Sequence, residues 1–81
     1  MVKRVGKCIV GDMNRVDAHT ADWHSVRLHP ATFYRRIDQF QESFDKVRGY
    51  YAEIDIGQYV LVRFSNKEDV TEFHRRHHEY I

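Results

Sequence analysis

The sequence predicts a small α+β domain in which a single antiparallel sheet carries two helices packed on one face. Three observations lead to this prediction. An apolar stripe at helical spacing lies within residues 30–48, two alternating apolar segments flank a glycine within residues 50–64, and a helix-start motif begins at residue 65. The length of 81 residues is that of one domain, so we expect a single domain over residues 1–81.

The first strand is predicted over residues 4–13. This segment contains the β-branched residues Val5, Ile9 and Val10, which favour extended structure. Residues 14–21 that follow are polar, and we expect them to form a turn rather than an element of the core.

A second strand is predicted over residues 23–28, where Val26 and Leu28 would share one face of the sheet. Pro30 comes next and suits the first position of a helix, because proline needs no partner for an amide hydrogen there. We therefore expect a helix over residues 30–48. Its apolar stripe consists of Phe33, Ile37, Phe40, Phe44 and Val47.

Residues further along the chain predict a hairpin that spans positions 50–64. A two-residue loop would place Glu53 opposite Val62, whereas a three-residue loop would place Ile54 opposite Val60. A slip of one residue turns every side chain of a strand to the other face of the sheet. The second register makes one face uniformly apolar, so the sequence favours the three-residue loop.

The second helix is predicted to begin at Ser65, because Ser65 and Glu68 match the capping box S-x-x-E. The resulting order, β-(β)-α-β-β-α, resembles an incomplete ferredoxin-like domain. One sheet with both helices on a single face is the economical packing of these elements. The apolar stripe of the second helix consists of Val70, Phe73, His77 and Ile81.

Charge, cysteine content and the length of apolar runs indicate the cellular location of the protein. Residues 1–36 carry seven basic and three acidic groups, for a charge of +4, whereas residues 37–81 carry six basic and nine acidic groups, for −3. Cys8 is the sole cysteine and has no partner for a disulfide. The chain lacks an apolar run long enough for a signal peptide or a membrane helix. We expect a cytoplasmic protein, or a host-cytoplasmic one if a virus encodes it, with no membrane partner.

Candidate chemistry is sparse in this sequence. Cys8 has no recognisable histidine partner, and the glycines do not match a phosphate-binding loop. His74 and His78 stand four residues apart on the second predicted helix, at a spacing that can hold one metal ion, but the motif H-E-x-x-H is absent. We therefore expect a non-enzymatic protein without a cofactor or a metal, and keep a small metal-dependent enzyme as a second alternative.

The outer face of the predicted sheet gives the main functional hypothesis. Tyrosine and arginine amid apolar residues are typical of the centre of protein interfaces. The sequence therefore predicts a binding module that docks onto another protein as a regulator, an inhibitor or an accessory subunit. The edge of strand 4–13 is expected to support a homodimer. The predicted interface residues are Tyr51, Tyr59, Leu61 and Arg63.

Binding of single-stranded nucleic acid is the alternative hypothesis. The segments 8–13 and 57–64 resemble the first-strand and third-strand motifs of RNA-recognition domains. That resemblance implies that bases stack on the sheet face, where Tyr59 is the one aromatic residue among the matching positions. The expected phosphate contacts come from Lys3, Arg4, Lys7, Arg35 and Arg36.

Overall fold

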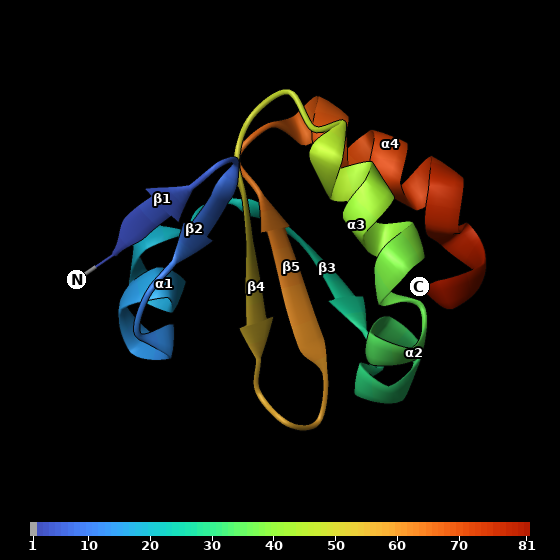
Figure 1. Cartoon of the computed structure of the whole chain (residues 1–81), viewed down its shortest axis with the longest axis horizontal. Coiled ribbons are helices and arrows are strands. Elements are labelled where there is room, and N and C mark those ends of the chain that lie inside the picture. Colours follow the sequence, from blue (N-terminus) through green and yellow to red (C-terminus); the bar gives the residue numbers. More distant parts are fainter. Residues whose placement is uncertain (1) are drawn as a thin grey trace.

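The computed structural model describes residues 2–81 as a small α+β fold around one five-stranded sheet (Figure 1). None of the helices within these residues combines the length and the apolar character that crossing a membrane requires. In chain order the elements are β1 (Lys3–Val5), β2 (Cys8–Val10), α1 (Met13–His19), β3 (His24–Leu28), α2 (Pro30–Arg35), α3 (Ile37–Asp45), β4 (Tyr51–Asp55), β5 (Val60–Phe64), α4 (Lys67–His77) and the 3₁₀ turn η1 (His78–Tyr80).

The sheet is mixed, with the strand order β1-β2-β4-β5-β3. β2 runs parallel to β4, and every other neighbouring pair is antiparallel. Helices α3 and α4 lie on one side of the sheet and α1 on the other (Figure 1). The prediction of a wholly antiparallel sheet with helices on one face alone is therefore wrong. The incomplete ferredoxin-like topology stays a prediction.

The predicted strand over residues 4–13 is in fact a hairpin of β1 and β2. The chain reverses at Gly6, whose φ of +61° is readily adopted by glycine and opens a two-residue turn. The predicted turn over residues 14–21 is also wrong, since this segment forms most of α1. Val16, 3% exposed, is the buried apolar residue of α1, so the segment lacks the apolar stripe that announces a helix.

The strand predicted over residues 23–28 is confirmed as β3, but the helix predicted over residues 30–48 is interrupted. Arg36, at φ −113° and ψ 28°, separates α2 from α3, and α3 ends at Asp45. In an unbroken helix, Phe33 and Phe40 would be separated by about 10 Å along the axis, because they are seven residues apart. The break lets the ring of Phe33 fold back to 5.6 Å from that of Phe40, and both residues are buried.

The hairpin over residues 50–64 is confirmed as β4 and β5, but its predicted register is wrong. Glu53 lies opposite Val62, as a two-residue loop requires, and Gly57 has the φ of +86° that such a loop uses. The apolar pattern indicated the wrong register because both faces of β4 are covered. Ala52 and Ile54 pack on the side of α1, while Glu53 is exposed on the other face, where partial burial of its carboxyl group raises its pKa.

The capping box predicted at Ser65 is displaced by one residue. Asn66 caps α4, because its side chain accepts a hydrogen bond from the Glu68 amide at 2.8 Å. The Ser65 hydroxyl oxygen instead accepts from the Tyr50 amide at 2.8 Å and ties β4 to β5. The predicted stripe is confirmed at Phe73 and His77, which are both buried.

Two groups of buried side chains hold the fold together. The aromatic cluster fills the space between the sheet and helices α2 to α4, and the small cluster lies under α1. In the aromatic cluster the ring of Phe73 lies 5.7 Å from that of Phe40 and 5.9 Å from that of Phe44. The aromatic cluster is built around Phe33, Phe40, Phe44, Phe64 and Phe73, and the small cluster consists of Ile9, Val16, Ala52 and Ile54.

Candidate functional site

A groove opens between α1 and the β4–β5 hairpin, on the sheet face opposite α3 and α4. The groove encloses about 340 Å³, and α1, β4 and the hairpin loop supply its walls. Its floor is Ile54, which is 2% exposed and belongs to the small cluster. We call this feature the hairpin groove. Its lining residues are Met13, Asn14, Asp17, Ile54, Ile56, Tyr59 and Leu61.

The rim of the hairpin groove exposes apolar side chains to solvent. Met13 is 49% exposed and Ile56 is 43% exposed, while Tyr59 and Leu61 are half-buried. These residues come from both walls, so the apolar surface continues across the groove. Exposed apolar side chains that gather around a concave site typically mark a binding surface.

Local hydrogen bonds fix the hairpin loop that forms one wall. The Ile56 amide donates to the Tyr59 carbonyl at 3.1 Å, and the Gly57 amide donates to the Asp55 carboxylate at 2.8 Å. The Tyr34 hydroxyl of α2 also donates to Asp55, at 2.7 Å. The bond from Tyr34, together with that from Gly57, lowers the pKa of the Asp55 carboxyl. The loop is therefore anchored to α2 and presents Ile56 and Tyr59 in a defined conformation.

Asp17 is the charged residue among those that line the groove, and two arginines lie beside it. The guanidinium of Arg27 lies over the ring of Tyr59, 4.5 Å from the ring centroid. The guanidinium of Arg63 donates to the Asp17 carboxylate at 2.6 Å and to the Thr20 hydroxyl at 3.2 Å. Arg63 has a side chain only 13% exposed, so it clamps α1 onto β5 and offers little surface to a partner.

The structure separates the four residues that were predicted to share one interface. Tyr59 and Leu61 line the hairpin groove, and Arg63 lies behind it under α1. Tyr51 is on the opposite face, a correction to the prediction, because the observed register turns its ring toward the helices. It is 7% exposed and stacks on Phe44 at 4.4 Å, and burial raises the pKa of its hydroxyl to about 12.

Met13 and Ile56 are the exposed apolar residues of the groove that sequence reasoning missed. Met13 is the first residue of α1, but the sequence placed it at the end of the predicted strand 4–13 and placed the following residues in a turn. The spacing of Met13, Val16 and Thr20 is helical, and it was the one available signal for this helix. Ile56 was assigned to the hairpin loop, where a single exposed apolar residue carries no pattern.

The basic residues of the nucleic-acid hypothesis do not form one surface. Lys3, Arg4 and Lys7 belong to the β1–β2 hairpin, whereas Arg35 and Arg36 lie at the junction of α2 and α3, at a distant end of the molecule (Figure 1). Several of them have partners within the fold. The Lys7 ammonium donates to the Val47 carbonyl at 2.5 Å, and the guanidinium groups of Arg4 and Arg36 lie over the rings of Tyr50 and Tyr80.

The candidate metal and nucleophile positions remain isolated. Within residues 2–81, no three histidine, cysteine, aspartate or glutamate side chains come close enough to hold a metal ion. His74 and His78 are both exposed. Cys8 is half-buried on β2, and burial raises the pKa of its thiol, which favours the less reactive protonated form.

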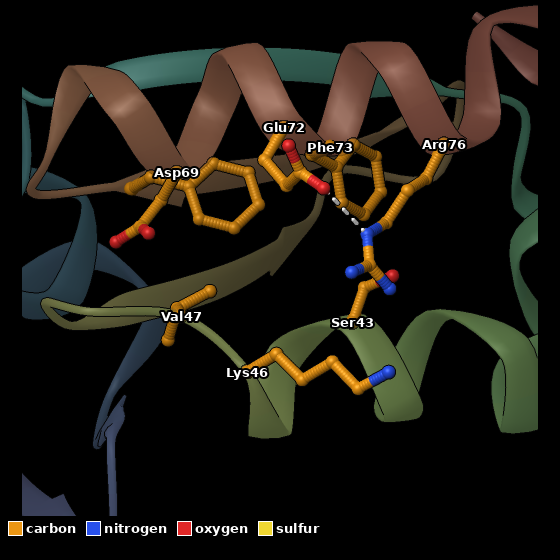
Figure 2. A pocket seen from close by; sticks show the side chains of 8 residues that line it. Ser43, Lys46, Val47, Asp69, Glu72, Phe73 and Arg76 are labelled. Atoms are coloured by element: carbon orange, nitrogen blue, oxygen red, sulfur yellow. Dashed lines mark hydrogen bonds and ion pairs between the residues drawn. The ribbon is translucent and has the colours of Figure 1, made fainter.

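A second hollow lies between α3 and α4 and is shown in Figure 2. It encloses about 20 Å³, room for about one water molecule. Its acidic groups already have partners in the protein. Glu72 accepts hydrogen bonds from Arg75 and from Arg76, which lower its pKa to about 2, and Asp69 accepts from the amides of Arg48 and Gly49. We interpret this hollow as a structural seam between the helices.

A histidine that bonds to Ser43 beside this seam is expected to make stability depend on pH. His77 Nε2 forms a buried hydrogen bond with Ser43 Oγ at 2.7 Å, and burial lowers the His77 pKa below its ordinary 6.5, helped by nearby Arg76. The unfolded chain therefore binds a proton more readily than the folded chain. We expect the contribution of His77 to the free energy of unfolding to be constant above pH 6.5. Below pH 6.5 this contribution should make the free energy of unfolding fall as the pH drops.

Urea unfolding of the wild type and of His77→Gln across this range checks the expectation. The variant removes the titrating group, so its stability should change less below pH 6.5 than that of the wild type. His74→Gln, at an exposed site on the same helix, is the matched control and should keep the wild-type slope. Equal slopes for all three proteins would show that His77 is not the responsible group.

Comparison of the chain with family models, with curated proteins and with solved structures finds no match.

Proposed function

We propose that this protein is a non-enzymatic binding module that docks onto another protein through the hairpin groove. One observation carries the proposal: apolar residues on two different walls, Met13 and Ile56, are 49% and 43% exposed around a buried apolar floor. Such a groove suits an apolar side chain of a partner, because burying it removes further apolar area from water. A regulator, an inhibitor or an accessory subunit would act in this way.

Charge supports a protein partner over a nucleic acid at this surface. Asp17 lines the groove, and the positive charge of Arg63 is already paired with that carboxylate. Arg27 is engaged with the Tyr59 ring. Nucleic-acid surfaces instead need unpaired cations that can neutralise several phosphates along one track.

The double variant Tyr59→Ala with Leu61→Ala should keep the fold and lose association. It removes two half-buried side chains from the groove and leaves the aromatic cluster untouched. We expect the loss of two such interface residues to weaken binding by about a hundredfold or more, because central aromatic and apolar anchors carry most of the energy of an interface. Photocrosslinking in the cells that make the chain, with a crosslinking residue at Ile56, measures this effect.

A matched control removes the same kind of surface elsewhere. Tyr50 and Val5 are 38% and 58% exposed and lie outside the hairpin groove, so Tyr50→Ala with Val5→Ala should leave crosslinking unchanged. A crosslinker at the exposed Gln39 of α3 should give no adduct. Adducts that survive the groove variant, or that nuclease digestion removes, would contradict a protein-docking groove.

A further inference from the structure

The two edges of the sheet differ in how open they are. β1 forms one edge with three residues, and β3 forms the other with five. Natural sheets blunt their edges with short strands, lysines, prolines or bulges. β1 is short and begins with Lys3 and Arg4, two of these protective features. β3 contains no proline and pairs with β5 without a bulge, and its one cation is Arg27. The β3 edge therefore lacks the usual protection.

Two main-chain hydrogen bonds define which groups of β5 point toward which neighbouring strand. The Ile56 amide donates to the Tyr59 carbonyl at 3.1 Å, and the Ser65 amide donates to the Tyr50 carbonyl at 2.9 Å. In an antiparallel ladder, successive residues direct their amide and carbonyl groups to opposite sides. The odd-numbered residues of β5 therefore bond with β4, and the even-numbered ones point toward β3.

The same alternation identifies the open groups of β3. Val26 lies opposite Val62 in the β3–β5 register, so the even-numbered residues of β3 bond with β5. Ser25 and Arg27 then direct their amide and carbonyl groups outward, and both residues are exposed. Within residues 2–81, no other element hydrogen-bonds to these groups.

We propose that two copies of this chain associate through their β3 strands, antiparallel about a two-fold axis, to form one continuous ten-stranded sheet, twice the five strands of one copy. In the register that we propose, Val26 lies opposite Val26 of the second copy. Ser25 then lies opposite Arg27 of the second copy, and Arg27 opposite Ser25. Ser25 and Arg27 of both copies direct their main-chain amide and carbonyl groups toward the junction. Each Ser25–Arg27 pair can therefore exchange two main-chain hydrogen bonds.

Charge selects this register from its neighbours. A shift by two positions in one direction would place Arg27 opposite Arg27 of the second copy, and like charges directly opposite each other are destabilising. A shift in the other direction would leave Leu28 beyond the paired region. The proposed register avoids both, and its centre is a pair of valines, a residue that suits a pleated surface.

Helix α4 adds contact area beside the proposed junction. α4 packs over β3 and β5, and Asp69, Glu72 and Arg76 form its flank toward α3. The opposite flank, with half-buried Val70 and exposed His74, borders the β3 edge. In the two-fold dimer these flanks would face one another. The contact is small, so we expect a reversible dimer of micromolar affinity.

Sedimentation equilibrium over a wide concentration range tests the dimer with two proline variants. Ser25→Pro removes an outward-facing amide hydrogen at the β3 edge, and proline is tolerated at such edge positions. Arg4→Pro is the matched change at the other edge. The Tyr51 amide of β4 donates to the Lys7 carbonyl, so the odd-numbered residues at β2 direct their main-chain groups toward β4. Arg4 lies opposite Ile9, so its own main-chain groups point away from β2, toward the open edge. We expect Ser25→Pro to be monomeric, and Arg4→Pro to dimerise like the wild type.

Two charge variants test the register and do not depend on the proline variants folding. Ser25→Lys would face Arg27 of the second copy and should weaken the dimer about tenfold, whereas Ser25→Glu should tighten it by about the same factor. The proposal fails if the wild type is monomeric at every concentration. It also fails if Ser25→Pro, folded by circular dichroism, dimerises as tightly as Arg4→Pro, or if the Lys and Glu variants shift affinity in the same direction.

Discussion

Replacing Phe73 with alanine is expected to lower the free energy of unfolding by about 3–5 kcal/mol, the largest effect of any single change considered for this chain. Phe73 is 2% exposed and contacts three other rings of the aromatic cluster, those of Phe40, Phe44 and Phe64. Truncation removes these contacts and leaves a cavity that close-packed neighbours cannot fill. A chain of this length has a total stability of roughly 4–12 kcal/mol, so this loss removes a large part of its margin against unfolding.

Urea titration followed by far-ultraviolet circular dichroism measures this loss. Phe73→Leu, which keeps most of the apolar volume, should lose much less stability and serves as the conservative comparison. Tyr34→Ala, at a site that is 54% exposed, controls for the loss of an aromatic ring as such. A loss below about 1 kcal/mol for Phe73→Ala would show that the cluster does not depend on this ring.

The second large effect is expected at Asp69, where a buried carboxylate holds the loop between α3 and β4. Its two oxygens accept hydrogen bonds from the Arg48 amide at 2.9 and 3.1 Å, and one also accepts from the Gly49 amide at 2.9 Å. Asp69→Ala would leave two main-chain donors without a partner. We expect a loss of about 3 kcal/mol in the free energy of unfolding, since bonds to a charged group are stronger than average.

Asp69→Asn distinguishes this role from a simple loss of volume. The amide keeps one acceptor oxygen, so the variant should retain part of the stability that alanine loses. The loop also leaves no room for adjustment, because a Cβ at Gly49 would collide with the Ser65 hydroxyl. Equal stability of Asp69→Ala and the wild type in thermal unfolding would contradict this account.

Much of the helical and strand content could be predicted, since it rests on periodic apolar residues. The pattern at Phe33, Phe40 and Phe44 identifies the helical segment correctly, because all three residues are buried against the same sheet. The break at Arg36 follows from tertiary packing of Phe33, which leaves no mark in the local spacing. Periodicity therefore indicated which segments are helical and not where they bend.

The register and the candidate site were harder to predict because both depend on α1. The predicted β4–β5 register requires one sheet face to be solvated, but α1 covers that face through Val16. Because the sequence did not predict α1, it gave no reason to expect that Ala52 and Ile54 are buried. Tyr59 and Leu61 were still assigned to the correct side, since their orientation depends on alternation with Val60 and Val62, which are 1% and 0% exposed.

The division of the interior into two unequal clusters has a consequence for motion. The small cluster contains four residues, whereas the aromatic cluster contains most of the large buried rings. Detaching α1 from the sheet would disrupt the small cluster and the Arg63 contacts to Asp17 and Thr20 but would leave the aromatic cluster in place, at a free-energy cost well below that of global unfolding. One wall of the groove therefore rests on the part of the molecule that opens most easily, and its width can adapt to ligands of different size without melting the rest of the chain.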